Sequence, residues 1–339
     1  MKILIVCSPE YDFTASQTCE GLHNLKIQDK QNIDFRVTEK SNYSYCYSSG
    51  LMHNYYISDK EAVDFGKESD LIILCSNRFV KEHIVEMINK PEKTIYIDGL
   101  DEYQFYKEPS HYILYFKREK MRFLNYADNI FPFPMCTENR YFTCHIDGDL
   151  DKIYNLDCSK LNFKYNHKNL SVSCMFGKTD KKKIWREWIQ QTVSDMNIEN
   201  STIKPIYSKS IDKTKFYIDT GKRYHYDYCE NLFNSKISID GLGASGASTS
   251  RFWESLANGC CLFTQHIQVE FPDHNFVENE DYISFDDKDD LKDKLNYLLK
   301  NENELQIIAE NGFKKTIKYH SSKNRVQYLL DKCKEYKII

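Results

Sequence analysis

The 339-residue chain lacks the features that mark several large classes of protein. No apolar run approaches the roughly 18 residues that a membrane-spanning helix needs. The opening MKILIVCSPEYDF has too short an apolar run for a secretory signal peptide and no small-residue cleavage pattern. The 12 cysteines include no CxxC pair and no Cys/His cluster at zinc spacing. We therefore expect a cytoplasmic protein with buried free thiols and no metal site.

Basic residues are also too few for a general nucleic-acid binder. Lysine and arginine number 46 against 50 acidic residues, which gives a net charge of −4. Broad nucleic-acid binding normally needs a basic face, so we expect no nucleic-acid partner. Peripheral membrane association stays open.

Glycines are scarce where a dinucleotide-binding enzyme would need them. The first predicted strand is followed by Ser8-Pro9-Glu10 and not by a GxGxxG pattern. This absence disfavours a dinucleotide-dependent oxidoreductase.

What the chain does contain is an alternation of apolar β-type runs and helices, which is typical of α/β domains with parallel sheets. Its length suffices for two ordinary domains, each with its own core. Pro132 and Pro134 forbid helix and indicate an extended segment at a domain edge. The predicted strands of the first half cover residues 2–7, 33–37, 70–76, 93–97, 112–116 and 130–134, with helices at 14–25 and 79–89.

A second α/β pattern begins after a polar, irregular stretch at 137–168, where we expect the connection between domains. We predict an N-terminal domain over 1–160, a C-terminal domain over 161–320, and a final helix that packs back toward the N-terminal domain over 321–339. Trp185 and Trp188, on a helix over 184–196, are expected in the core. Predicted strands cover 170–176, 236–240, 260–264 and 282–285, with further helices at 251–258, 289–299, 302–310 (capped by Gly312) and 322–336.

Residues 236–264, KISIDGLGASGASTSRFWESLANGCCLFT, are the most informative stretch. They predict a strand, a loop of small residues, an amphipathic helix that Gly259 ends, and a second strand. Such a loop leaves backbone N–H groups exposed at the N-terminus of the helix, where they suit a phosphate group. The stretch therefore predicts a site for a nucleotide diphosphate.

The chain from Leu170 onward resembles the donor-binding half of glycosyltransferases with two facing Rossmann-like domains, the B-type or GT-B fold. The likeness is closest to the bacterial group 1 type that includes CgeB-like proteins. It is carried by Phe176-Gly177-Lys178, by residues 243–264 with their R-x-x-E-x-x-A-x-G pattern, by Glu280–Ile283 and by residues 312–325. The first half matches in architecture only. The resemblance implies an α/β fold of two Rossmann-like domains across a cleft.

The resemblance also implies roles for particular residues. Glu254 aligns with a glutamate that accepts hydrogen bonds from the ribose of the donor, and a carboxylate suits that task because both oxygens accept. Arg251 and Lys178 are expected to contact the diphosphate. Gly177, Gly243, Ser248 and Thr249 complete the predicted donor site. The co-substrate would be a nucleotide sugar, most simply a UDP- or GDP-sugar, with no cofactor and, because no DxD pair stands in a metal-binding context, no metal ion.

One departure from the family leaves the stereochemistry open. Many retaining members carry a second glutamate eight residues before the ribose-binding one, and here that position is Gly246. An inverting enzyme would need a general base from loops at the carboxyl ends of N-terminal strands. Asp12 and Asp98 are the candidates by position. Each has an alternative role, Asp12 as a helix cap and Asp98 in a turn with Gly99.

We thus predict a hexosyltransferase-type enzyme that moves a sugar from a nucleotide sugar to a glycan, a lipid-linked saccharide or a protein. The alternative is a non-catalytic paralogue that binds a nucleotide or glycan, which the missing second glutamate favours. A phage-type DNA glucosyltransferase shares the fold, but the acidic charge balance disfavours it.

Overall fold

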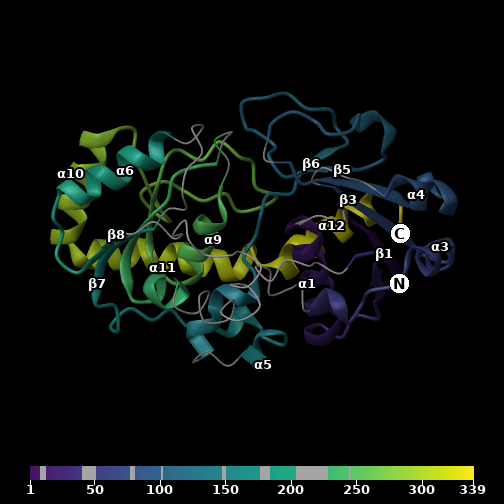
Figure 1. Cartoon of the computed structure of the whole chain (residues 1–339), viewed down its shortest axis with the longest axis horizontal. Helices are drawn as coiled ribbons and strands as arrows, with labels where there is room; N and C mark the ends of the chain where they lie inside the picture. Colours follow the sequence, from purple (N-terminus) through teal and green to yellow (C-terminus); the bar gives the residue numbers. More distant parts are fainter. Residues whose placement is uncertain are drawn as a thin grey trace, which may run out of the picture.

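The computed structural model describes residues 1–7, 13–39, 51–76, 81–100, 102–146, 150–175, 184–203, 228–243, 246 and 248–339. The strands in these residues form two separate sheets, one of six strands and one of five, and every strand pair in both is parallel. Figure 1 shows one sheet in each half of the molecule. The predicted α/β class with two Rossmann-like domains is confirmed.

The N-terminal sheet has the order β2-β1-β3-β4-β5-β6 and is covered on both faces. In β1 (Lys2–Val6), Ile3 and Ile5 pack with α1 (Phe13–Gln28) and α12 (Ser322–Glu335). Leu4 and Val6 pack with α3 (Asp59–Lys67) and α4 (Glu82–Ile88) on the other face. This two-residue alternation is what a strand buried on both faces requires. The elements are β1 Lys2–Val6, α1 Phe13–Gln28, β2 Asp34–Val37, α3 Asp59–Lys67, β3 Leu71–Ser76, α4 Glu82–Ile88, β4 Thr94–Asp98, β5 Tyr115–Lys117 and β6 Ile130–Pro132, with 3₁₀ turns η1 Pro91–Lys93 and η2 Pro109–His111.

Strand β6 lies at the edge of this sheet, where a proline is tolerated because its missing N–H faces no partner strand. The prediction that the proline-rich run is extended is confirmed for Ile130–Pro132.

The C-terminal sheet has the order β11-β10-β9-β7-β8. Its core joins Val172, Ile237 and Phe263 on the strands to Leu291, Leu295 and Ile308 on the helices. The elements are β7 Leu170–Cys174, α6 Ile184–Asp195, β8 Ser201–Ile203, β9 Ser235–Ile239, α9 Ser250–Ala257, β10 Cys261–Thr264, β11 Ile283–Ser284, α10 Lys288–Lys300, α11 Glu302–Tyr319 and α12 Ser322–Glu335.

The first part of the connection between the sheets, residues 139–145, is buried, although its sequence predicts a polar loop, whereas most of the described residues from 152 to 169 are exposed or half-buried. It contains η3 (Asn139–Ile146), α5 (Leu150–Ile153) and η4 (Cys158–Lys160). Tyr141 and Phe142 are fully buried and belong to the same core as Phe252 and Trp253 of α9. The connection therefore forms the wall against which α9 packs.

Helix α12 and the segment around Met121 both join the halves. Helix α12, the yellow helix that continues from α11 across Figure 1, places Val326 and Leu329 in the N-terminal core. It approaches α1 so closely that a Cβ at Gly21 would lie 2.4 Å from the carbonyl oxygen of Ser322. Farther along, Met121 forms an antiparallel bridge with Val269.

The described cysteines are all buried, and none of them forms a disulfide with another described cysteine. Among the described helices, none combines the length and apolar character that crossing a bilayer requires.

The predicted helix cap at Gly312 is wrong. Helix α11 runs through this glycine to Tyr319. A Cβ at Gly312 would lie 2.4 Å from the carbonyl oxygen of Asp281 and 2.8 Å from a methyl group of Leu256. A glycine is required at this position because the backbone of α11 approaches the backbone at Asp281 closely. It does not mark the end of the helix.

Substitution Gly312→Ala tests this packing role. In an ordinary helix interior, alanine is more stable than glycine by about 1 kcal/mol. Here we expect destabilisation by roughly 1–3 kcal/mol, because the added methyl group clashes with backbone. The measurement is the urea unfolding midpoint, with Ile307→Ala as control, since Ile307 is 58% exposed on the same helix. A more stable Gly312→Ala protein would contradict the assignment.

Candidate functional site

Strand β9, helix α9 and strand β10 follow one another as the sequence predicts, with the described residues 240–243, 246, 248 and 249 between β9 and α9. Strand β9 ends at Ile239, α9 begins at Ser250, and β10 pairs in parallel with β9. Gly259 has φ +66°, a left-handed conformation that suits glycine and ends the helix. The unit places the N-terminus of α9 at the carboxyl edge of the sheet, where ligands of parallel α/β domains bind.

The buried carboxylate of Asp240 holds the two ends of the loop together. It directly follows β9 and accepts a 2.6 Å hydrogen bond from Thr249 Oγ1. Thr249 is the N-cap of α9 and accepts in turn from the backbone N–H of Arg251. The Arg251 Nη1 atom lies 3.6 Å from Asp240 Oδ1. Burial raises the pKa of Asp240, and the Arg251 charge opposes this.

A tyrosine hydroxyl joins the two residues that the family resemblance selects. Tyr228, in a helical segment at 228–233, donates a 2.7 Å hydrogen bond to Glu254 Oε2 and accepts a 3.1 Å bond from Arg251 Nε. Arg251 and Glu254 stand about one turn apart on α9, so their side chains share a face. Burial raises the pKa of Glu254, whereas the charges of Arg140 and Arg251 lower it.

Positive charge at Glu254 also comes from the connection between the domains. Arg140 of η3 is buried and forms an ion pair with Glu138, with 3.1 Å between Nε and Oε2. Its charge is the largest influence that favours the ionised form of Glu254. The connection thus contributes to the electrostatics of the site and not only to its packing.

Two further side chains, Lys168 and Trp185, stabilise the unit through hydrogen bonds to its backbone carbonyl oxygens. The buried Lys168 ammonium donates to the carbonyl oxygens of Phe233, Ser235 and Asn258, at 2.8, 2.9 and 2.9 Å. These carbonyls belong to the segments that enter β9 and leave α9. The indole N–H of Trp185, a residue predicted only as core, donates to the carbonyl oxygen of Leu242 at 3.0 Å and so supports the loop.

The remaining predicted donor-site residues are placed as follows. Gly243 lies in the loop and Ser248 is buried at its end. Gly246, the position of the absent second glutamate, has φ +79°, and a Cβ there would lie nearest to Met121 and Gln268, so this residue faces the junction of the domains. Gly177, Lys178 and the candidate base Asp12 lie outside the described residues, and their roles stay predictions.

Asp98 has the environment of a structural carboxylate. It is fully buried and accepts hydrogen bonds from Tyr115 Oη at 2.7 Å and from Lys117 Nζ at 3.0 Å. The backbone N–H groups of Leu100 and Tyr106 also bind it. These contacts agree with the alternative role in a turn and leave no evident approach for an acceptor hydroxyl, so the structure favours a structural role over that of general base.

Sequence reasoning missed Asp240, Tyr228 and Arg140. Asp240 could have been found, because a carboxylate directly after a predicted strand and before a small-residue loop lies at the ligand-binding edge. Tyr228 and Arg140 carry no local signal, since each reaches α9 from a distant part of the chain. No group of histidine, cysteine or acidic residues suited to hold a metal ion occurs among the residues that the structure describes.

A histidine between two carboxylates lies at the same edge of the C-terminal sheet. His266 Nδ1 is 2.8 Å from Glu278 Oε1, and Nε2 is 2.8 Å from Asp286 Oδ1. Carboxylates only accept, so both bonds form together when both ring nitrogens carry protons. The hydrogen bond to Glu278, and then that to Asp286, raise the pKa of His266 despite its partial burial.

Comparison with known proteins agrees with this architecture. Residues 212–331 match a family described as "Glycosyl transferase-like", and the whole chain superposes on glycosyltransferases of two facing domains. The chain has a GT-B glycosyltransferase fold. The predicted resemblance is thereby confirmed at the level of this fold, and the narrower CgeB-like assignment stays a prediction.

Three solved structures illustrate the likeness. A glycosyltransferase from Rickettsia africae has TM-score 0.62 at 12% identity, over 99% of this chain and 98% of that one. HepE of Anabaena in complex with UDP and glucose has TM-score 0.57 at 9% identity, over 99% and 100%. An alpha-glucosyltransferase in complex with UDP has TM-score 0.61 at 10% identity, over 98% and 100%. At these identities the likeness is one of fold. No curated protein sequence matches the chain.

The His266 contacts predict a specific pH dependence of stability. Because the pKa of His266 is raised in the folded state, the stability that the protonated ring contributes is fully present below the pKa of the unfolded chain, about 6.5. It is lost as the pH rises through the pKa of the folded state. We expect the free energy of unfolding of the wild type to exceed that of His266→Gln by up to about 1 kcal/mol at pH 6, because the ion pairs are partly exposed. At pH 9 we expect a smaller difference. Urea unfolding of both proteins across this range measures it. A difference that does not change with pH would contradict the proposed ion pairs.

Proposed function

We propose that this chain is a glycosyltransferase that binds the nucleotide diphosphate of a sugar donor at the N-terminus of α9. The observation that carries the proposal is the Tyr228 hydroxyl, which binds Arg251 and Glu254 at once and so presents a cation and a carboxylate side by side. The match of residues 212–331 to glycosyl transferase-like sequences supports it.

In this proposal Glu254 binds the ribose and Arg251 binds the diphosphate. Tyr228 engages only Oε2 of Glu254, and a carboxylate accepts through both oxygens, so capacity for ribose hydroxyls remains. Arg251 is held by Tyr228 and Asp240 with its guanidinium at the start of α9, where the helix dipole adds positive potential. Lys178, a candidate from the sequence alone, would add a second cation.

The arrangement would also stabilise the leaving group. As the bond between the sugar and the diphosphate breaks, negative charge develops on the diphosphate. A helix N-terminus and a fixed guanidinium stabilise such charge without reorganising, because they are already oriented. We therefore propose a metal-independent transfer, with UDP-glucose as the first donor to test, since HepE and the alpha-glucosyltransferase were each solved with it.

For the acceptor we propose a glycan, a lipid-linked saccharide or a protein. One similar alpha-glucosyltransferase was solved with DNA. The net charge of −4 disfavours that acceptor here, because binding to a phosphate backbone depends on lysine and arginine.

A second candidate is a non-catalytic protein that binds a nucleotide sugar or glycan. It is favoured by Gly246, which carries no carboxylate at the predicted sugar side of the loop, and by the structural contacts of Asp98. Release of UDP from UDP-glucose, with and without glycan acceptors, separates the two candidates: binding without release identifies the non-catalytic one.

Conservative variants test the donor site directly. We expect Glu254→Gln and Tyr228→Phe each to weaken UDP binding by roughly 10- to 100-fold in isothermal titration, the effect of losing a hydrogen bond to a charged group. Both changes preserve the shape of the side chain, so folding should be retained. The control is Tyr282→Phe, which removes a similar hydroxyl that donates to Glu278 in the same domain at 3.0 Å.

The proposal fails if UDP and GDP bind the wild type and both variants equally. It also fails if neither nucleotide binds the folded wild-type chain. A thermal-shift series at increasing nucleotide concentration gives an independent check, because a ligand that binds only the folded state raises the melting temperature by mass action.

A further inference from the structure

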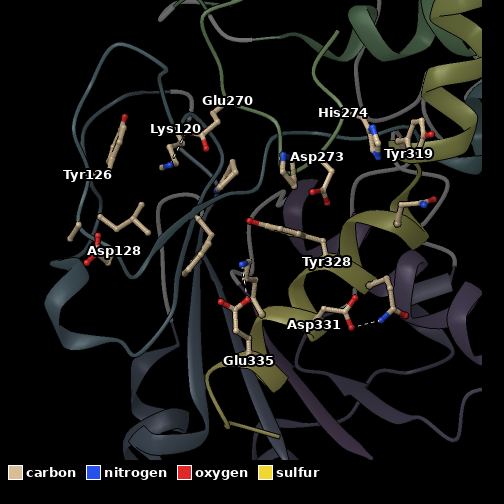
Figure 2. A pocket seen from close by; sticks show the side chains of 18 residues that line it. Lys120, Tyr126, Asp128, Glu270, Asp273, His274, Tyr319, Tyr328, Asp331 and Glu335 are labelled. Carbon is tan, nitrogen blue, oxygen red and sulfur yellow. Dashed lines mark hydrogen bonds and ion pairs between the residues drawn. The ribbon is translucent and has the colours of Figure 1, made fainter.

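A cavity of about 680 Å³ lies where the two domains meet, along edge strand β6 and one face of α12 (Figure 2). This volume is in the range of ligand sites, which span roughly 300–1,000 Å³. None of the described residues that line it belongs to the cluster of Tyr228, Asp240, Arg251 and Glu254. It is therefore a second concave surface, separate from the proposed donor site.

Aromatic rings stand on opposite walls of this cavity. Figure 2 shows Tyr126 on one side, His274 and Tyr319 on the other, and Tyr328 between them. The rings of His274 and Tyr319 stack with 3.6 Å between centroids and 24° between planes. Both residues line the cavity, so this stacked pair, the aromatic platform, forms part of its wall.

The backbone of His274 is strained in a way that fixes this platform. Its φ is +53°, a left-handed conformation that residues with a Cβ seldom adopt. Its carbonyl oxygen accepts from His320 Nε2 at 3.0 Å, which holds the turn in place. Such strain clusters at ligand-binding positions, where the surrounding structure maintains it.

The charged groups in the cavity are mostly paired with one another. Glu270 lies 2.7 Å from Lys120, and Glu335 lies 2.7 Å from Lys332. Asp331 accepts from Gln327 at 2.8 Å. The walls therefore carry hydrogen-bond donors as well as acceptors and are not lined by carboxylates alone. With five carboxylates against two lysines in the lining, an anionic ligand is disfavoured.

We propose that this cavity binds a neutral oligosaccharide. The hydroxyl groups of a sugar both donate and accept, so they match lysine, amide and carboxylate groups. The C–H face of a pyranose carries slight positive charge and stacks on the negative face of an aromatic ring. The proposal concerns binding alone, so it stands or falls separately from sugar transfer at α9.

The test is binding of neutral tetrasaccharides to the full chain by saturation-transfer NMR and titration calorimetry. The probes are maltotetraose, cellotetraose and N-acetylchitotetraose, with tetralysine and tetragalacturonate as charged comparisons. We expect a neutral probe to bind, the charged ones not to bind, and excess UDP not to displace the sugar. Binding of tetralysine in place of every neutral probe, or displacement by UDP, overturns the proposal.

Two glycine variants distinguish loss of the aromatic ring of His274 from a general effect on folding. His274→Gly removes the ring at a position whose φ favours glycine, so the fold is retained and the neutral probe should bind on the order of tenfold more weakly. The matched control is Asn279→Gly, at φ +62° and outside this cavity, which should bind as wild type does. Equal affinity of both variants, or no binding of any neutral probe to wild type, also overturns the proposal.

Discussion

Burial of the Asp240 carboxylate is the constraint on which the C-terminal domain depends. An isolated buried carboxylate costs several kcal/mol, and here Thr249 and Arg251 compensate it. Satisfying that charge fixes where the loop ends, where α9 begins and where the Arg251 guanidinium lies. Tyr228 then extends the arrangement to Glu254. The residues proposed to bind a donor are thus held by the same contacts that stabilise the strand, loop and helix unit.

The two domains are joined by structures that also shape the sites. The connection places Tyr141 behind α9 and Arg140 beside Glu254, so it affects both packing and charge at the proposed donor site. Helix α12 returns to the N-terminal core and, with β6, forms one side of the second cavity. Because residues of both domains line the second cavity, movement of one domain against the other would alter it.

The sequence was sufficient to predict most of the strands and helices and the α9 unit, since these follow from apolar periodicity and from small residues next to a helix start. It did not predict helix α3 or the short edge strand β8. It was insufficient where distant segments meet. Gly312 resembles a helix end in sequence, but its role is set by the backbone at Asp281. Asp98 was a candidate base by its place after a strand, and only the structure shows Tyr115 and Lys117 bound to it. Tyr228 could not be found, because its partners on α9 are about 25 residues away in the chain.

The central claim is that a nucleotide sugar binds at the start of α9 through Glu254 and Arg251. A crystal structure of the full chain with UDP-glucose tests it most directly. The account predicts ribose hydroxyls within hydrogen-bond distance of Glu254 and the diphosphate at Arg251 and the helix N-terminus. A nucleotide that binds elsewhere and contacts neither Arg251 nor Glu254 would contradict it.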